Sequence, residues 1–378
     1  MKFIIFTHNY PTSISERRNA GIFVHDFACE LAKTNSVSVV CPGSFNKKTK
    51  FDGVTVYFFS WGNGKHLGKL RFWNPLDLSN GLNLIRQGFN TLRVAVKETK
   101  PDFALVMWAI PGGFFAYIAK VIYGIPYAIW VLGSDFYVYS KIPILGFFIS
   151  SVLKSAKYTF ADGISLSSQV GEVTGKKCFF LPSSTTFDTK VKNQKSKNHR
   201  KEIVLTFIGR MELIKGPDLL VDAILKLQGK ISNFRINFIG DGSLLPRLEK
   251  RVEKGNVKRY VRFYGNLDDR SKIINVLSAS DWIIIPSRSD SIPLVFSEAM
   301  KVGVPVIASD LPDLKYFIDK YKVGLNFKTE DSNELSRIIG NLTNYNKRMK
   351  EFKSNASKVA GMFTVKSSVD EFLKMISV

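Results

Sequence analysis

The sequence predicts an α/β protein of two domains, each built on a parallel sheet that is covered by helices. Its 378 residues exceed what one ordinary core accommodates and suit two domains of comparable size. Short runs of β-branched and aromatic residues alternate with helical patterns along the chain, which is typical of such sheets. Residues 188–202 are polar, basic and aperiodic, and we interpret them as a linker between two series of elements.

The N-terminal series occupies residues 1–187. Apolar residues at spacings of three and four predict one helix from Leu82 to Val96, and a second helix is predicted to start near Gly21. Strands are expected at Phe3–Phe6, Val37–Cys41, Val54–Phe58, Ala104–Trp108, Tyr127–Val131 and Lys157–Phe160.

The C-terminal series occupies residues 203–360, and residues 361–378 are predicted to form a last helix that crosses back to the N-terminal domain. Strands are expected at Ile203–Ile208, Arg235–Ile239, Val261–Phe263, Trp282–Ile285 and Val304–Ile307. Helices are expected at Pro217–Gln228, Leu244–Glu253, Ser271–Ser278 and from about Val295.

The apolar stretches are predicted to belong to the fold and not to span a membrane. The run that begins the chain is too short for a signal peptide and suits a buried first strand. Glycine, proline and lysine divide the stretch from Phe103 to Leu132 into strand, helix and strand. The patch Ile142–Ile149 reaches about one and a half helical turns once Pro143 and Gly146 are considered, and is either a shallow membrane anchor or core.

The formal net charge of +22 is spread over both halves of the chain. Residues 1–185 hold 20 basic and 10 acidic side chains, and the remainder holds 34 and 22. No nucleic-acid-binding motif accompanies this charge, so nucleic acid is not expected as a partner. Anionic phospholipid headgroups, phosphate-bearing substrates and a solvated basic surface each account for it.

Metal and disulfide chemistry are not predicted. The three cysteines, Cys29, Cys41 and Cys178, are scattered and lack metal-ligand spacing, which suits buried thiols in a reducing cytoplasm. Asp268 and Asp269 adjoin each other, but no third ligand is evident near them in the sequence.

The segment from Gly209 to Gly216 carries the first candidate site. It follows a predicted buried strand and precedes the helix that starts at Pro217. Glycine permits close approach of the backbone, and a helix start offers N–H groups to an anion. Arg210 and Lys215 add two positive charges, so the segment suits a diphosphate. The alternative is two solvated basic residues on a loop.

The segment from Pro286 to Pro305 carries the second candidate site. It also follows an apolar strand and places Asp290 in a loop and Glu298 in the following helix. Glu298 is able to accept hydrogen bonds from two ribose hydroxyls, or simply complements the helix dipole, which is worth ~0.3–1 kcal/mol. The backbone at this helix start, Ser291-Ile292-Pro293-Leu294-Val295, is placed to meet phosphate or sugar oxygens. All of these residues except the proline offer an N–H group.

The two segments together resemble the C-terminal domain of the retaining glycosyltransferase family 4, over about residues 203–327. That family has the GT-B fold, in which two Rossmann-like, doubly wound domains face each other across a cleft. The resemblance implies that Arg210 and Lys215 are catalytic and hold the donor diphosphate, with Gly209 beside them. It further implies that Glu298 holds the ribose, and that Asp290 with Ser291 to Val295 holds the transferred hexose.

Other family positions are matched more loosely. Asn266 and Leu267 follow Tyr264-Gly265 where relatives contact the nucleobase, and Gly21 resembles a loop that passes close to the donor. The family usually has Glu followed by Gly where this chain has Asp290 and Ser291. The shorter carboxylate is expected either to alter which hexose is accepted or to weaken the sugar contact.

The acceptor side is matched in the N-terminal half. Trp108 precedes an Ala-Ile-Pro-Gly-Gly run, and Gly133-Ser134-Asp135 follows a predicted strand, as in the acceptor-side loops of the family. Many relatives have histidine where this chain has Leu132, so no histidine role carries over. Asp135 is therefore the candidate for orienting the acceptor hydroxyl, unless it only forms a turn or a helix cap. His8 ends the first strand and is a further candidate acceptor contact, although a lone histidine there is more often structural.

The resemblance implies a cytoplasmic, metal-independent hexosyltransferase that uses a UDP- or GDP-linked sugar as co-substrate, with no cofactor. The acceptor is expected to be a glycan or a lipid-linked glycan in cell-surface polysaccharide assembly, with peripheral attachment to the inner membrane face as a further possibility. A nucleotide-sugar epimerase of the same fold and a non-catalytic basic binding protein are the alternatives.

Overall fold

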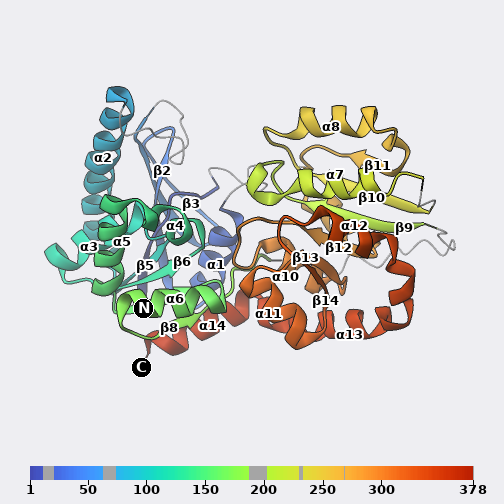
Figure 1. The fold of residues 1–378 in the computed structure, drawn as a ribbon. Helices are drawn as coiled ribbons and strands as arrows, with labels where there is room; N and C mark the ends of the chain where they lie inside the picture. The colour runs from blue at the N-terminus through green and yellow to red at the C-terminus, as the bar shows by residue number, and fades with distance from the viewer. Residues whose placement is uncertain (12–20, 63–73, 187–201, 230–232, 268, 378) are drawn as a thin grey trace. The chain divides into compact units, whose positions relative to one another are not determined.

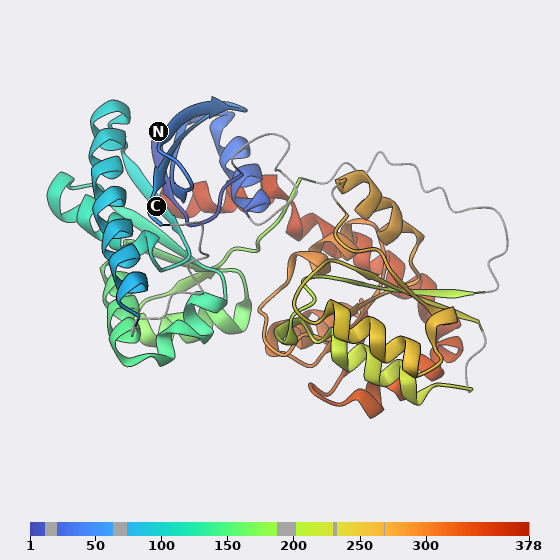
Figure 2. The same cartoon turned by 90° about the horizontal axis from the view of Figure 1, so that it is seen from above.

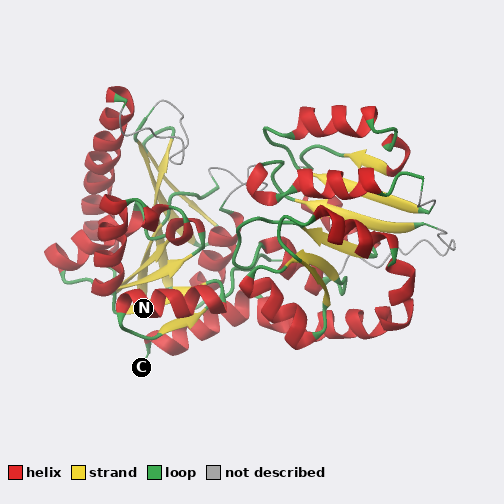
Figure 3. Cartoon of the chain, viewed as in Figure 1, coloured by secondary structure: helices red, strands yellow, loops and turns green. Residues whose placement is uncertain are grey.

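The computed structural model describes residues 1–11, 21–62, 74–186, 202–229, 233–267 and 269–377. Almost all of the predicted linker at 188–202 lies outside these residues, as does Asp268. The chain divides into two compact units, of which unit 1 comprises Met1–Thr185 and Val365–Val378 and unit 2 comprises Thr186–Thr364. Both units are α/β structures with sheets of mainly parallel strands, which confirms the predicted fold class (Figures 1 and 3).

Unit 1 contains an eight-stranded sheet in the order β3-β4-β2-β1-β5-β6-β7-β8. Neighbouring strands are parallel except β3 and β4, which form an antiparallel hairpin at one edge. The strand order reverses at β1, which pairs with β2 on one side and with β5 on the other. The strands are β1 (Lys2–Phe6), β2 (Ser36–Gly43), β3 (Lys47–Phe51), β4 (Val54–Ser60), β5 (Phe103–Met107), β6 (Tyr127–Val131), β7 (Tyr158–Ala161) and β8 (Cys178–Phe180).

Helices of unit 1 cover the sheet and bury its apolar side chains. The central strands β1, β5 and β6 are almost wholly buried, since helices lie over both of their faces. The helices are α1 (Ile22–Ala32), α2 (Pro75–Thr99), α3 (Gly112–Tyr123), α4 (Ser134–Tyr137), α5 (Pro143–Ser155), α6 (Ile164–Thr174) and α14 (Val365–Ile376).

The last helix of the chain, α14, packs within unit 1 although it follows unit 2 in the sequence (Figure 2). Its Phe372 ring contacts Phe3, Phe27 and Phe160 at centroid distances of 5.9, 5.8 and 5.5 Å. The Ser368 hydroxyl donates a hydrogen bond to the carbonyl of Pro182 at 2.9 Å. The apolar core of unit 1 thus includes side chains from α14 as well as from β1, α1 and β7.

Unit 2 contains a six-stranded parallel sheet in the order β11-β10-β9-β12-β13-β14. Here the order reverses between β9 and β12, which are paired neighbours. The strands are β9 (Ile203–Ile208), β10 (Phe234–Ile239), β11 (Val261–Phe263), β12 (Trp282–Ile285), β13 (Val306–Ser309) and β14 (Gly324–Phe327). The helices are α7 (Pro217–Lys226), α8 (Leu245–Lys254), α9 (Arg270–Ala279), α10 (Leu294–Lys301), α11 (Pro312–Tyr321), α12 (Ser332–Gly340) and α13 (Met349–Val359).

The apolar patch predicted as one and a half turns at 142–149 is longer in the structure, so that prediction is wrong. The whole segment from Pro143 to Ser155 is one helix, α5. Pro143 stands in its first turn, where a missing N–H costs nothing, and so does not stop the helix. Gly146 is required inside it, because a Cβ there would lie 2.2 Å from the carbonyl oxygen of Ser140.

Strands β3, β8 and β14 were not predicted from the sequence. The Lys-Lys-Thr-Lys run of β3 lacks apolar residues, and β8 and β14 are only three and four residues long. The stretch from 103 to 132 does form strand, helix and strand, as predicted. Within the described ranges, every helix is too short or too polar to cross a lipid bilayer.

Candidate functional site

The two candidate segments of unit 2 meet at the point where the strand order reverses. Strand β9 leads into the Gly209–Gly216 loop, and its neighbour β12 leads into the loop that begins at Pro286. In open parallel sheets, ligands bind outside the carboxyl ends of the strands at this reversal. The sequence predicted each loop separately, and the sheet topology places them together.

Gly216 marks the closest approach of these two loops. A Cβ atom at Gly216 would lie 1.9 Å from the carbonyl oxygen of Pro286, and its φ is +67°. A hydrogen bond of 2.9 Å from the Arg288 N–H to the Ile214 carbonyl joins the same loops. Only glycine combines this dihedral with this proximity, so the residue keeps the loops together.

The charged side chains of the two loops form an ion pair. The Lys215 ammonium lies 2.6 and 2.8 Å from the two carboxylate oxygens of Asp290. Both side chains are largely buried, with 22% and 16% exposed. The structure thus brings the predicted diphosphate lysine and the predicted hexose carboxylate into direct contact. Arg210 lies on the exposed part of its loop, and the described residues offer it no ion pair.

Arg288 is a residue of this region that the sequence analysis missed. Its guanidinium donates to both carboxylate oxygens of Asp218 at 2.8 Å and to the carbonyl of Leu213. The hydrogen bonds to Asp218, and to a lesser extent the one to Glu330, raise the pKa of Arg288 above its usual range. Arg288 therefore connects the β12 loop to the start of α7. Its position in the loop after a buried strand, two residues before Asp290, was the available signal.

Glu298 lies in the second turn of α10, and its side chain is 15% exposed. Arg270, the first residue of α9, approaches it with 3.5 Å between Nη2 and Oε1. The sequence analysis did not identify Arg270. At the other end of the candidate loop, Ser291 and Ile292 are buried, and Pro293 is the residue before the first turn of α10. Leu294 and Val295 begin the helix itself.

Two further strand ends complete this edge of the sheet. A Cβ at Gly240, after β10, would lie 2.0 Å from the Gly209 carbonyl oxygen, so Gly240 packs directly against the first candidate loop. The Gly240 N–H donates to the carbonyl of Gly265 at 2.8 Å, which places Asn266 and Leu267 in the adjoining loop after β11. Loops from four neighbouring strands are thus adjacent here.

The candidate acceptor residues of unit 1 also follow neighbouring strands at a reversal of strand order. His8 follows β1 and Trp108 follows β5, and their rings lie 4.3 Å apart between centroids. Burial lowers the pKa of His8 to about 4, so its imidazole is neutral at pH 7. Its Nδ1 atom is buried and has no hydrogen-bond partner among the described residues.

Gly21 lies beside the same segment. A Cβ there would lie 2.8 Å from the carbonyl carbon and oxygen of Asn9, and its φ is +100°. Helix α1 begins at the next residue, and the Phe23 ring contacts Trp108 at 5.4 Å between centroids. The structure therefore brings Gly21, His8 and Trp108 together.

Asp135 is buried, with 1% of the residue exposed. Its carboxylate accepts hydrogen bonds from the Ala109 N–H at 2.7 Å and from the Leu132 N–H at 3.1 Å. Burial raises its pKa to about 6, although these N–H donors oppose the shift. Asp135 therefore ties the β5 loop to the β6 loop, and neither oxygen is directed freely to an acceptor. Gly133, at φ +89°, and Ser134 lead into α4 beside it.

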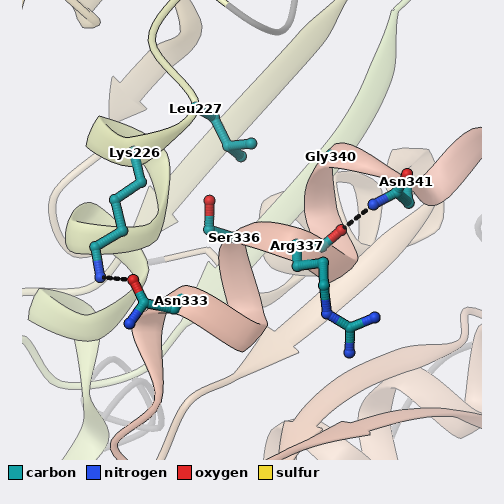
Figure 4. A pocket seen from close by; sticks show the side chains of 7 residues that line it. All are labelled: Lys226, Leu227, Asn333, Ser336, Arg337, Gly340 and Asn341. Carbon is teal, nitrogen blue, oxygen red and sulfur yellow. Dashed lines mark hydrogen bonds between the residues drawn. The ribbon is translucent and has the colours of Figure 1, made fainter.

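A surface pocket elsewhere in unit 2 contains none of the predicted site residues (Figure 4). It lies between α7 and α12, where the Lys226 ammonium donates to Asn333 Oδ1 at 2.6 Å. This pocket is therefore separate from the loops at the carboxyl edge of the sheet.

The comparison with known families bears on these loops. Residues 188–359 match the family model of glycosyl transferases group 1. These residues belong to the glycosyl transferases group 1. The match includes both candidate loops of unit 2, together with Lys215, Asp290 and Glu298.

Individual group 1 relatives are similar over different lengths. The chain is 33% identical to a D-inositol 3-phosphate glycosyltransferase of Jonesia denitrificans over 129 residues, which are 32% of this chain and 30% of the relative. It is 26% identical to the putative teichuronic acid biosynthesis glycosyltransferase TuaC of Bacillus subtilis over 369 residues, 90% of this chain and 88% of that protein. The chain spans less than half the length of several other curated relatives that it matches.

Solved structures share the fold of this chain. Sucrose-phosphate synthase from Thermosynechococcus elongatus superposes with a TM-score of 0.82 at 15% identity and covers 100% of this chain and 98% of the other. HepE from Anabaena, in complex with UDP, superposes with a TM-score of 0.74 at 14% identity over the whole of both chains. At these identities the likeness shows the fold alone, which is GT-B.

Proposed function

We propose that the protein is a retaining glycosyltransferase that moves a hexose from a nucleoside-diphosphate sugar to a glycan or lipid-linked acceptor. The observation that carries the proposal is the contact between Lys215 and Asp290 at the strand reversal of unit 2. It places a cation for the diphosphate beside a carboxylate for the sugar. Membership of residues 188–359 in the group 1 family supports the same assignment.

The donor roles follow from the position of each loop. Lys215 and Arg210 bind the diphosphate, and the first N–H groups of α10 add donors to its oxygens. Glu298 accepts from the ribose hydroxyls, and Asp290 accepts from a hexose hydroxyl. The N–H groups of Ser291 and Ile292 donate to sugar oxygens. Gly209, Pro293, Leu294 and Val295 shape the loops around the sugar and phosphates, and Asn266 and Leu267 contact the base.

Donor binding rearranges the ion pair under this proposal. Lys215 gains a phosphate oxygen as a second anionic partner, while a hexose hydroxyl donates to the Asp290 carboxylate. Because the two side chains start in contact, the diphosphate and the sugar that it carries are recognised by one linked pair. UDP is the leading carrier, since HepE is described in complexes with UDP and UDP-glucose.

The reaction needs no protein nucleophile. The acceptor oxygen bonds to the anomeric carbon on the face from which the diphosphate leaves, and the bond from that carbon to the phosphate oxygen breaks. The acceptor proton passes to the leaving phosphate oxygen. Lys215 and Arg210 stabilise the charge that develops on the leaving group, which is the part a divalent cation plays elsewhere. Added Mg²⁺ or Mn²⁺ should accordingly leave turnover unchanged.

The acceptor side has different roles for its residues. His8, Trp108, Gly133 and Ser134 contact the acceptor in this proposal, and neutral His8 offers its imidazole to a hydroxyl. Asp135 acts as a positioning residue, because its carboxylate holds the two acceptor loops through their backbone N–H groups. The description of TuaC as a putative teichuronic acid glycosyltransferase supports a surface polysaccharide as the product.

A panel of UDP- and GDP-sugars tests the donor assignment. A donor that binds only the folded protein at 100 times its Kd stabilises it by about 2.7 kcal/mol and raises its melting temperature. We expect one sugar nucleotide to do so with wild-type protein but not with Lys215→Ala or Glu298→Gln. No shift with any donor would contradict the proposal, and isomerised donor formed without an acceptor would favour an epimerase instead.

A lipid-linked acceptor implies a second property, shallow attachment to an anionic membrane. Ile144 and Phe147 of α5 are 83% and 79% exposed, and Lys141 precedes them. Exposed apolar side chains beside a basic residue suit the headgroup region of a bilayer. We propose that this end of α5 inserts there, which would place the protein at the cytoplasmic membrane face.

Sedimentation with anionic liposomes tests this attachment. We expect wild-type protein in the pellet at low salt, and less of it after Ile144→Ser with Phe147→Ser. Leu76→Ser with Leu82→Ser is the matched control, because those α2 side chains are also exposed. Equal sedimentation of both double variants, or none of the wild type, would exclude a role for α5.

A further inference from the structure

A cluster in unit 1 joins an imidazole, a thiol and a carboxylate that none of the roles above uses. His25 and Cys29 stand one turn apart on α1, and Asp52 lies in the turn between β3 and β4. Their ligand atoms all lie within 4.8 Å of one another. The sequence offered no metal spacing, because the third member lies 23 positions beyond Cys29 and reaches it only through the fold.

The contacts within the cluster converge on one nitrogen. His25 Nε2 lies 3.1 Å from an Asp52 carboxylate oxygen and 3.4 Å from Cys29 Sγ. The other nitrogen, Nδ1, lies 2.9 Å from the Tyr10 hydroxyl. In a Cys-His-Asp catalytic arrangement the thiol and the carboxylate occupy opposite nitrogens. Here both groups lie nearest Nε2, although Sγ is also 3.7 Å from Nδ1, so the arrangement suits a common ligand better than a nucleophile and its base.

We propose that His25, Cys29 and Asp52 bind a zinc ion. Imidazole, thiolate and carboxylate are the ligand types of Zn²⁺, whereas Mg²⁺ and Ca²⁺ require sets of oxygen atoms. The nitrogen-to-oxygen and nitrogen-to-sulfur separations are close to those between ligands of a tetrahedral zinc, given bonds of about 2.0 to 2.3 Å. The ion would tie α1 to the β3–β4 hairpin.

The surroundings meet the other requirements of such a site. Tyr10 is placed as the outer partner that fixes the imidazole, since Nδ1–H donates to its hydroxyl oxygen when Nε2 binds metal. Asp52 is 41% exposed, which leaves a path for the ion and a position for water as fourth ligand. His25 itself is buried, so its orientation is held by packing against the Phe51 and Tyr10 rings.

Zinc binding would require rotation of one side chain and the loss of one proton. Cys29 Sγ lies 3.4 and 3.7 Å from the two nitrogens, so it stands beside the ring and must rotate about its Cα–Cβ bond to meet an ion at Nε2. The thiol loses its proton to solvent, the imidazole proton resides on Nδ1, and the Asp52 carboxylate enters already ionised. No oxidation or group transfer occurs.

Cobalt(II) titration of the reduced, tag-free full chain tests the proposal, because Co²⁺ bound to a thiolate gives a near-ultraviolet charge-transfer absorption. We expect that absorption to saturate at one equivalent, to disappear when Zn²⁺ is added, and to be absent in Cys29→Ser. Cys41→Ser and Cys178→Ser are the matched controls and should retain it. An absorption that survives Cys29→Ser, or none in the wild type, would overturn the site.

Asp52→Asn gives an independent measurement, because this exposed turn residue is replaced by a side chain of the same shape. We expect zinc affinity in a competition titration to fall at least about tenfold, the scale on which even outer partners of a metal act. The melting temperature without metal serves as the folding control for both variants. Unchanged zinc affinity in Asp52→Asn would exclude the carboxylate and overturn the three-ligand site.

Discussion

In the proposed function, the Lys215–Asp290 contact is the pair of side chains that recognises both parts of a nucleotide sugar. The lysine ammonium is held within 3 Å of both carboxylate oxygens, so its position is fixed before any phosphate arrives. Preorganised charge of this kind stabilises a leaving group without reorganisation at the moment of reaction. At the scale of single residues, the proposed mechanism therefore depends on this pair.

Replacement of Lys215 by alanine tests that role. We expect turnover to fall by about 100-fold or more, on the scale of losing one oriented electrostatic donor. Lys226→Ala is the control, since this lysine lies at the far end of α7 and bonds to Ser332 and Asn333. Sugar transfer by both variants would be followed under saturating donor. A Lys215→Ala enzyme with near-normal turnover would remove the lysine from the mechanism.

His8 provides a residue-scale prediction on pH. Burial lowers its pKa from 6.5 to about 4, so between these values the unfolded chain binds a proton that the folded chain does not. The stability that His8 contributes is therefore complete above pH 6.5 and is lost as the pH falls toward 4. An NMR titration of the His8 ring should have its midpoint near pH 4. A midpoint near 6.5 would show that the ring is solvated.

At the scale of elements, glycines determine how closely the loops of unit 2 approach. Gly216 packs against Pro286, and Gly240 packs against Gly209, so loops from β9, β10 and β12 share one surface without side chains between them. This close packing forms the candidate diphosphate site.

Gly216→Ala tests the effect of this close approach on stability and binding. We expect a loss of about 2 kcal/mol or more, because the new methyl group adds an overlap with Pro286 to a strained positive φ. Gly229→Ala is the matched control, since its φ is +76° but its Cβ has no neighbour within 4 Å. Chemical denaturation and donor titration of both variants measure the difference. Equal losses would mean that the clash is relieved without moving the loops.

At the scale of the whole molecule, the chain end is part of the N-terminal core. Phe372 is buried among rings from β1, α1 and β7, far from it in sequence. Folding of unit 1 must therefore include residues that are made only after unit 2. The chain still divides into two compact units, because only the segment that contains α14 returns from unit 2 to unit 1.

Phe372→Ala measures how much unit 1 depends on that helix. Removal of a buried phenylalanine ring costs about 3–5 kcal/mol, so we expect unit 1 to lose stability by that order. Hydrogen exchange should show reduced protection in peptides of unit 1 and unchanged protection in unit 2. Lys374→Ala, an exposed change on the same helix, is the control. Protection lost equally in both units would indicate that they unfold as one.

Local pattern was sufficient for most elements. The alternation of apolar strands and amphipathic helices predicted both sheets, and Ile203–Ile208, Val261–Phe263 and Trp282–Ile285 were predicted with the bounds they have in the structure. Motif order also identified Lys215, Asp290 and Glu298 as candidates. The strand predictions succeed because burial of a strand leaves its mark in adjacent residues, whereas the roles of the three site candidates stay predictions. The strands β3, β8 and β14 and the length of α5 were not predicted, because their residues are too few or depart from those local patterns.

The tertiary structure decided which of these residues meet. Pairing of β9 with β12 brings Lys215 against Asp290 across 75 positions, and burial turns Asp135 from an expected acceptor contact into a tie between two loops. Arg288, Arg270 and the cluster of His25, Cys29 and Asp52 emerged in the same way. The sequence specifies the chemistry of each side chain. The distances between side chains and their exposure to water are decided only when the strands take their order in the sheet.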